Sequence, residues 1–228
     1  MSVSTYERAK ARYRDAAVAA AYDSWRYETP RGRRRNRRDL AAIGRALDEA
    51  ARRGAPVREA LDLPCGTGRL APLLFERSIS AAGADVSLEM LRETFRKLGK
   101  KFPIFQCSAD AIPLRAASYD AVFAIRFLFH LDRPGRAAVF REMARVSRRW
   151  LILDVRHRYN LRWVGWRIRH ALGLLPSVQH RFSRAGLAEE LSEAGLAVRG
   201  IYPSRRYFGW VSDKWTVLAE TERPAADR

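Results

Sequence analysis

The sequence contains few cysteines, few histidines and no long uncharged apolar run. Its two cysteines, Cys65 and Cys107, are too few for a disulfide framework. The four histidines are scattered and lack metal-ligand spacing, so we expect no metal site. No stretch of about 18 uncharged apolar residues predicts a transmembrane helix. The N-terminus carries Glu7, Arg8 and Lys10 without an apolar segment, so we expect a cytoplasmic protein without a secretory leader.

Lysine is also scarce, although basic residues dominate the charge. Only five of the 43 basic residues are lysine, and the formal net charge is +18. This excess of arginine indicates either an anion-binding protein or a GC-rich genome, and the sequence leaves both explanations open. The resulting positive field favours nucleic acid, acidic lipid or a phosphorylated substrate as partner.

The 228 residues suffice for one α/β domain with a buried core. Short apolar strands alternate with helices, which predicts βαβ units around a parallel sheet. We expect a Rossmann-like three-layer sandwich with a mostly parallel seven-stranded sheet and an antiparallel C-terminal strand. The expected strands are 57–63, 79–85, 104–107, 119–125, 150–155, 196–202 and 211–219. The expected helices are 4–22, 37–53, 68–77, 87–98, 134–147, 158–175 and 183–194, with an aromatic and basic stretch between the first two.

The most specific feature is the segment ALDLPCGTGRLAPLL at residues 60–74. A strand ends at Asp62, a tight turn contains Gly66 and Gly68, and a helix follows. Residues without a Cβ let a nucleotide-like ligand approach the backbone, and the helix N-terminus offers N–H groups. Asp85 ends the next strand, where a Rossmann site places its ribose-binding acid. A turn without a ligand is the alternative, but packing does not readily explain two carboxylates at consecutive strand ends.

Residues 60–155 resemble the class I S-adenosylmethionine (SAM) dependent methyltransferases of the small-molecule type. In that family the turn reads acidic-x-Gly-x-Gly-x-Gly, and here it reads DLPCGTG, with Pro64 in place of the first glycine. Proline removes one backbone N–H from the turn. The resemblance implies that Asp62 and the turn hold the methionine part of SAM, that Asp85 binds the ribose hydroxyls, and that Asp110 lies beside the adenine. The cofactor-binding residues it implies are Asp62, Pro64, Cys65, Gly66, Gly68, Asp85, Val86, Ala109, Asp110 and Ala111.

A dehydrogenase of the same fold is the nearest alternative. The dinucleotide fingerprint expects a third glycine three residues after Gly68, and Ala71 stands there, which the fingerprint tolerates. The downstream segments SADAIPL and FLFHL resemble those of methyltransferases more closely.

His130 and Arg126 are the candidate catalytic residues. Both follow the fourth strand, at the catalytic edge of the expected sheet. The usual pKa of histidine, about 6.5, suits His130 as a general base, and capping of the loop before Pro134 is the alternative. Arg126 interrupts an apolar strand end, where it either binds an anionic group of the substrate or has a structural role.

The resemblance fades toward both ends of the chain, where substrate choice usually resides. By the resemblance we expect an N-terminal helical lid over 1–55, with Tyr22, Trp25, Arg26 and Tyr27 beside SAM. The cofactor-binding core covers 56–155, and a substrate helix and closing hairpin cover 156–220. Six of the eight residues from Arg31 to Arg38 are arginine, which indicates either a solvated face or a clamp for an anionic substrate.

Residues 156–175 combine tryptophans with arginines. This pattern is typical of a helix at a membrane surface, of a lid, or of a helix packed on the sheet. We expect an enzyme that transfers a methyl group from SAM to an oxygen or nitrogen atom of a small or lipid-linked, anionic or aromatic acceptor. An RNA-directed methyltransferase that uses the basic surface is the alternative, and peripheral contact with the inner membrane face stays open.

Overall fold

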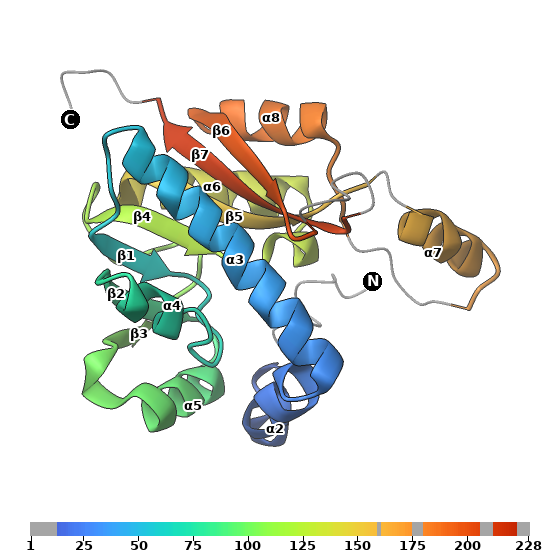
Figure 1. The fold of residues 1–228 in the computed structure, drawn as a ribbon, viewed down its shortest axis with the longest axis horizontal. Coiled ribbons are helices and arrows are strands. Elements are labelled where there is room, and N and C mark those ends of the chain that lie inside the picture. The colour runs from blue at the N-terminus through green and yellow to red at the C-terminus, as the bar shows by residue number, and fades with distance from the viewer. Residues whose placement is uncertain (1–12, 159–160, 175–179, 206–211, 223–228) are drawn as a thin grey trace.

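The computed structural model describes residues 13–158, 161–174, 180–205 and 212–222. Within them, seven strands form one sheet in the order β3-β2-β1-β4-β5-β7-β6, with helices on both faces (Figure 1). The strands are β1 (Glu59–Asp62), β2 (Ser80–Asp85), β3 (Ile104–Gln106), β4 (Tyr119–Ala124), β5 (Ser147–Arg156), β6 (Leu196–Pro203) and β7 (Lys214–Thr221). The α-helices are α2 (Ala16–Tyr27), α3 (Pro30–Arg52), α4 (Ala71–Glu76), α5 (Leu88–Leu98), α6 (Arg133–Val146), α7 (Leu161–Ala171) and α8 (Arg184–Ser192).

The strand directions confirm the fold class predicted from the sequence. Strands β1 to β5 pair in parallel with their neighbours. Only β7 runs the other way, because it pairs antiparallel with both β5 and β6. The result is a mostly parallel seven-stranded sheet with one antiparallel C-terminal strand.

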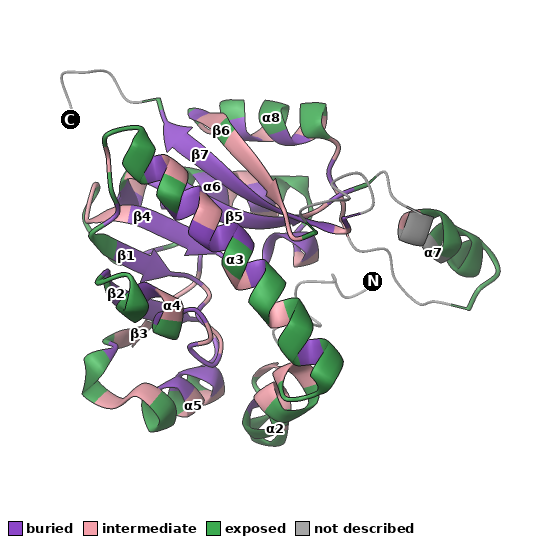
Figure 2. Cartoon of the chain, viewed as in Figure 1, coloured by how far each residue is buried: buried purple, intermediate pink, exposed green. Residues whose placement is uncertain are grey.

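The central strands of the sheet are mostly buried, whereas the edge strands β3 and β6 are mostly half-buried (Figure 2). Along β4, Ala121 and Phe123 face the helices α3 and α4, whereas Val122 and Ala124 face α6. Adjacent residues of a strand point to opposite faces of the sheet. Because helices cover both faces here, the residues of the strand are apolar throughout and do not alternate between apolar and polar. These continuous apolar runs made the strands recognisable in the sequence.

The basic stretch before residue 37 is helical, so the expected start of the second helix was wrong. Helix α3 begins at Pro30 and includes the whole run from Arg31 to Arg38. Thr29 caps it, because its Oγ1 accepts a hydrogen bond from the N–H of Gly32 at 3.0 Å. Proline suits the first turn of a helix, where its missing N–H costs nothing. The capping signal therefore lay in Thr29 and Pro30, ahead of the apolar period.

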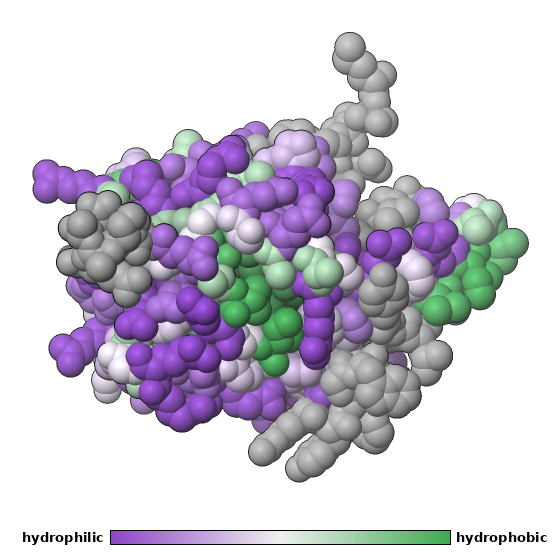
Figure 3. Space-filling view, turned by 90° about the horizontal axis from the view of Figure 1, so that it is seen from above, coloured by the Kyte–Doolittle hydropathy of each residue, from purple (hydrophilic) through white to green (hydrophobic). Residues whose placement is uncertain are grey.

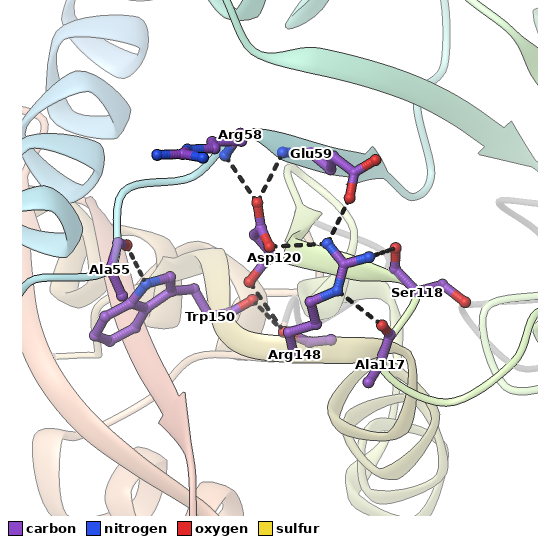
Figure 4. Close-up of polar contacts among 9 residues, drawn as sticks. Ala55, Arg58, Glu59, Ala117, Ser118, Asp120, Arg148 and Trp150 are labelled. Atoms are coloured by element: carbon purple, nitrogen blue, oxygen red, sulfur yellow. Dashed lines mark hydrogen bonds and ion pairs between the residues drawn. The ribbon is translucent and has the colours of Figure 1, made fainter. Parts of the chain in front are cut away.

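One arginine joins the amino ends of β1, β4 and β5 (Figure 4). Arg148 donates to Asp120 Oδ1 at 2.9 Å, to Glu59 Oε2 at 2.5 Å and to two backbone carbonyls. Burial raises the pKa of Asp120, but hydrogen bonds from Arg148 and from the N–H groups of Arg58 and Glu59 outweigh it and lower that pKa. This network stabilises the amino ends of the three strands, opposite to the carboxyl ends that are described below.

Helix α7 lies at one end of the structure, beside the body of the domain (Figure 1). Its side chains Val164 and Ile168 are exposed, as is Leu172 just after it. No helix among the described residues combines the length and the apolar character that crossing a bilayer requires.

Candidate functional site

The carboxyl ends of β1, β2 and β4 converge on a pocket that α2 and Tyr13, just before it, partly cover. The glycine turn after β1 forms its floor, and the segment after β4 forms one wall. Of the twelve site residues expected from the sequence, eight line this pocket: Asp62, Pro64, Cys65, Gly66, Asp85, Val86, Arg126 and His130. The other lining residues are Tyr13, Tyr22, Tyr27, Thr67, Arg69, Leu70, Met90, Ile125 and Phe127.

The two glycines of the turn serve different purposes. Both have positive φ values, +56° at Gly66 and +73° at Gly68, a conformation that side chains with a Cβ rarely adopt. At Gly66 a Cβ would meet no atom within 4 Å, so the backbone there lies open to the pocket. At Gly68 a Cβ would lie 2.7 Å from Leu98 Cδ1, so this glycine allows close packing against α5 and does not line the pocket.

Asp62 ends β1 and is only 2% exposed. Burial raises its pKa to about 7, and the Asp85 carboxylate adds to the rise, although Arg69 opposes it. Its Oδ1 has no hydrogen-bond partner among the described residues. A buried carboxylate without a partner costs free energy, and a cationic group in the pocket would remove that cost.

Asp85 ends β2 and is tied to the backbone. Its Oδ2 accepts a hydrogen bond from the N–H of Gly66 at 2.9 Å, and its Oδ1 accepts one from the N–H of Ser87 at 2.9 Å. Burial raises the pKa of Asp85, and these backbone N–H groups partly offset the rise. A carboxylate has about four lone-pair sites. Each oxygen of Asp85 therefore keeps capacity to accept a further hydrogen bond, such as one from a hydroxyl.

Aromatic side chains from the N-terminal part of the chain cover the pocket. The ring of Tyr22 makes edge contacts with Tyr13 at 5.8 Å and with Tyr27 at 5.9 Å. Burial raises the pKa of Tyr27 well above its usual range, so this tyrosine is neutral. Of the four residues expected beside SAM, Tyr22 and Tyr27 line the pocket, whereas Trp25 is 42% exposed and Arg26 lines a neighbouring cleft.

A polar clamp holds α2 against the glycine turn. Asp23 Oδ1 accepts a hydrogen bond from Thr67 Oγ1 at 2.6 Å, and Asp23 Oδ2 pairs with Lys97 Nζ at 2.5 Å. One aspartate of α2 thus joins the turn after β1 to the end of α5. The covering helix and the floor of the pocket therefore share direct contacts.

Sequence reasoning missed Arg69, which follows the turn directly. Burial lowers the pKa of this guanidinium, but nearby groups, among them the carboxylates of Asp39, Asp154 and Asp62, outweigh burial and raise the pKa. Its Nη1 donates to Asn36 Oδ1 at 2.5 Å, and its guanidinium lies 5.3 Å from the centre of the Tyr27 ring. The contacts of Arg69 come from α2 and α3, far away in the sequence, so its only sequence signal was its place after Gly68.

Arg126 and His130 both lie in the wall after β4. Arg126 adopts φ +63°, a strained conformation for a residue with a Cβ, and its guanidinium lies 5.8 Å from the centre of the Tyr27 ring. His130 ends the short 3-10 turn η2 (Leu128–His130), and its ring makes an edge contact with Tyr13 at 6.5 Å. Arg126 also lines a second cleft, called here the basic cleft, whose other basic residues are Arg26, Arg31, Arg34, Arg35, Arg38, Arg156, Arg205 and Lys214.

Three residues expected near the adenine do not line the pocket. Asp110 is exposed and accepts a hydrogen bond from Ser108 Oγ within its own turn, and Ala111 is exposed as well. Ala109 is buried in the core that packs against α6. The structure therefore brings the first two acids together but leaves Asp110 outside, and its contact with adenine stays a prediction.

The arrangement is an α/β domain with a pocket at the carboxyl ends of its parallel strands. Residues 60–149 match the family described as methyltransferase domain. This stretch, which is less than half of the chain, is similar to methyltransferase domains, and solved SAM-dependent methyltransferases share the fold of the chain.

A curated relative and several solved structures are similar to this chain. An O-methyltransferase of Pyrenophora dematioidea is 33% identical over 102 residues, which cover 42% of this chain and only 38% of that protein. Magnesium protoporphyrin IX methyltransferase from Synechocystis, solved with bound S-adenosylhomocysteine (SAH), superposes with a TM-score of 0.68 at 18% identity. That match covers 93% of this chain and 99% of the other. A SAM-dependent methyltransferase from Clostridium acetobutylicum gives a TM-score of 0.62 at 14% identity, over 82% and 91%. At these identities the structures establish a shared fold.

Proposed function

We propose that this chain transfers the methyl group of SAM to an oxygen or nitrogen atom of an acceptor held beside Arg126 and His130. The observation that carries the proposal is the unpartnered Oδ1 of Asp62, buried at the tip of β1 above the glycine turn. The ammonium group in the methionine part of SAM is the kind of cation that this carboxylate requires. The fit between the cofactor and the residues present is therefore electrostatic as well as spatial.

In this proposal the strand tips divide the cofactor between them. Asp62 and the backbone around Gly66 bind the methionine part, and Asp85 accepts hydrogen bonds from the ribose hydroxyls. Val86 and the apolar side chains of Met90 and Phe127, which line the same pocket, contact the adenine.

SAM, when bound, supplies an activated methyl group together with its own leaving group. The task of the protein is then to align the acceptor with that group and to exclude water. Alignment of two reactants accounts for roughly 7–11 kcal/mol of barrier reduction in favourable cases. The tyrosines that cover the pocket, Tyr13, Tyr22 and Tyr27, exclude water, and we assign residues 1–55 the role of a lid.

His130 is the proposed general base for a hydroxyl acceptor. It lies in the wall after β4 and lines the cofactor pocket beside Arg126. A hydroxyl must lose its proton during methyl transfer, whereas a neutral amine needs a base only later. Arg126 holds an anionic group of the acceptor and so fixes which atom faces the methyl group.

An RNA acceptor is the less favoured alternative. Single-stranded RNA binding normally combines basic residues with aromatic side chains on which bases stack. Among the described residues, those that line the basic cleft include no aromatic side chain. We therefore assign residues 156–220 to recognition of a small or lipid-linked acceptor.

Calorimetric titration with SAM and with SAH tests the cofactor assignment. We expect one site per chain, and Asp85→Ala should weaken SAH binding by about tenfold or more because it removes the acceptor of the ribose hydroxyls. Glu76→Ala on α4, an exposed acid away from the pocket, is the matched control. Equal affinities for the wild type and Asp85→Ala would refute the ribose contact.

A further inference from the structure

The basic cleft lies next to the cofactor pocket and carries a large excess of positive charge. Eight arginines and one lysine line it, against the two aspartates Asp39 and Asp213. Four of the arginines, Arg31, Arg34, Arg35 and Arg38, lie on one face of α3 at helical spacing. Arg126 borders both the cleft and the cofactor pocket, so it lies at the junction of the two.

The acids near the cleft are already engaged. Lys214 Nζ contacts Asp39 Oδ2 and Asp154 Oδ2, both at 2.9 Å. Asp213 pairs with Arg156 at 3.0 Å and with Arg181 at 2.5 Å. Asp39 and Asp154 share one lysine and so leave one negative charge beside the cleft, but no described carboxylate is within ion-pair distance of Arg26, Arg126 or the cleft arginines of α3.

Seven arginines of the cleft have no ion pair with any described residue: Arg26, Arg31, Arg34, Arg35, Arg38, Arg126 and Arg205. The Nε atoms of Arg26 and Arg126 are in addition buried without a hydrogen-bond partner. Arg148, at the other edge of the sheet, shows the contrast, because it has two carboxylates and two carbonyls as partners (Figure 4). Like charges held together without counter-charges destabilise a fold unless an anion binds between them.

The position of the arginines on α3 argues against a merely compositional origin. A helix N-terminus is the positive end of its dipole, where basic side chains are unfavourable and anions are favourable. The first turn of α3 contains no acid, and the arginine run starts there. A GC-rich genome would account for arginine in place of lysine, but not for the convergence of four of these arginines on one concave surface.

We infer that the basic cleft binds the acceptor through a group that carries several negative charges, of the polyphosphate type. The assignment of this group to the methyl acceptor rests on the proposed function, whereas the anion site itself does not depend on it. Arginine matches phosphate oxygens through paired N–H donors, and seven arginines without an ion pair exceed what a single monoanion neutralises. Arg126 binds the end of this group nearest the cofactor pocket, so the atom to be methylated lies on the far side of Arg126 from α3.

Calorimetry on the full chain at constant ionic strength tests the site, with inorganic phosphate, pyrophosphate and tripolyphosphate as probes. We expect tripolyphosphate to bind one site per chain about tenfold or more tightly than inorganic phosphate, with SAH bound at the same time. Arg34→Gln should weaken tripolyphosphate by about tenfold and leave SAH affinity within about twofold. The control is Arg37→Gln, which removes the same charge from the same helix outside the cleft and should change neither affinity.

Two results would overturn the inference. One is equal loss of tripolyphosphate binding in Arg34→Gln and Arg37→Gln, because a diffuse field rather than a site would then bind the anion. The other is a short single-stranded RNA that binds more tightly than tripolyphosphate and is weakened by both substitutions, which would indicate a nucleic-acid surface. Tripolyphosphate binding without any SAH binding would instead refute the proposed function and the acceptor role, and leave only an anion site.

Discussion

Asp62, Asp85 and Asp120 lie on neighbouring strands of one sheet, yet their carboxylates have different surroundings. Asp120 accepts hydrogen bonds from Arg148 and two backbone N–H groups, and its pKa is lowered. Asp85 is held by backbone N–H groups, and burial still raises its pKa. Asp62 has an oxygen with no partner, and its pKa reaches about 7. The first arrangement stabilises the fold, and the last is the one that a ligand completes.

We predict that Asp62 makes cofactor affinity depend on pH. Because its pKa lies near 7, the carboxyl is largely protonated at pH 6 and must release its proton to pair with an ammonium group. SAH affinity should therefore rise several-fold from pH 6 to pH 7.5, with proton release that calorimetry in two buffers of different ionisation enthalpy detects. The Asp62→Asn variant should bind SAH weakly at both pH values. Absence of proton release when the wild type binds SAH at pH 6 would contradict the assignment of Asp62 to the ammonium group.

The same pKa predicts how Asp62 affects stability without cofactor. The pKa of Asp62 in the folded chain is about 7, above the ordinary value of 3.8. Between about pH 4 and pH 7 the folded state therefore keeps a proton on Asp62 that the unfolded state has lost. The free energy of unfolding should then fall as pH rises from about 4 to 7. Urea unfolding of the wild type and Asp62→Asn at pH 5 and pH 7 measures this difference. A difference between the two proteins that does not change with pH would contradict it.

A second prediction at this scale concerns His130. If it acts as the base for a hydroxyl acceptor, His130→Ala should lower kcat by about 10²–10⁴-fold and remove the acidic limb of the pH–rate profile. SAH affinity should change little, because the proposed cofactor contacts lie elsewhere. Retention of kcat with an unchanged pH profile would leave His130 as a residue that only caps its loop.

At the scale of elements, the pocket depends on contacts between helices and turns that are distant in the sequence. Asp23 of α2 makes polar contacts both with the glycine turn and with α5. Helix α3 supplies Asn36 to Arg69, and it supplies its arginine face to the basic cleft. The strands position the acids, whereas α2 covers the cofactor pocket and α3 lines the basic cleft beside it.

We predict that Asp23→Ala releases α2 from the turn and speeds the dissociation of SAH. The clamp is partly exposed, so its loss should cost only about 0.2–1 kcal/mol of stability. Stopped-flow dissociation should nevertheless be several-fold faster, because the covering helix loses both polar contacts. Asp48→Ala on α3, whose partner Arg77 lies away from the pocket, is the control. Equal dissociation rates in all three proteins would show that α2 does not gate the pocket.

Helix α7 permits a test of the expected membrane contact, which stays a prediction. An exposed apolar residue recurs every four positions along this helix and just beyond it, at Val164, Ile168 and Leu172. Exposed Arg167 and Arg169 lie among them. Figure 3 shows an apolar surface at this end of the molecule. An apolar stripe beside basic residues suits an acidic lipid surface. The chain should therefore sediment with phosphatidylglycerol vesicles and not with phosphatidylcholine vesicles.

The substitution Ile168→Glu should abolish this sedimentation. Leu88→Glu, at an exposed leucine on α5, is the matched control, because it adds the same charge at a similarly exposed apolar site. Equal sedimentation of the two variants would count against a lipid-binding role for α7.

For the whole molecule, local sequence patterns predicted the sheet and its cofactor turn but not the enclosure of the site. The carboxyl end of a strand can be predicted because it follows an apolar run. Asp62 and Asp85 were therefore identified correctly as residues at the ends of neighbouring strands. The basic cleft was not predictable, since α3, the turn after β4 and the start of β7 meet only in the folded chain. The arginine run from Arg31 to Arg38 is evident in the sequence. Its helical conformation depends on the cap at Thr29, which the spacing of the apolar residues did not indicate.

The most direct measurement is a crystal structure of the chain grown with SAH. The account predicts the ligand in the pocket above Gly66, with its ammonium group within hydrogen-bond distance of Asp62 Oδ1 and its ribose hydroxyls on Asp85. A ligand bound elsewhere, or a pocket filled by protein side chains with Asp62 paired to one of them, would contradict it.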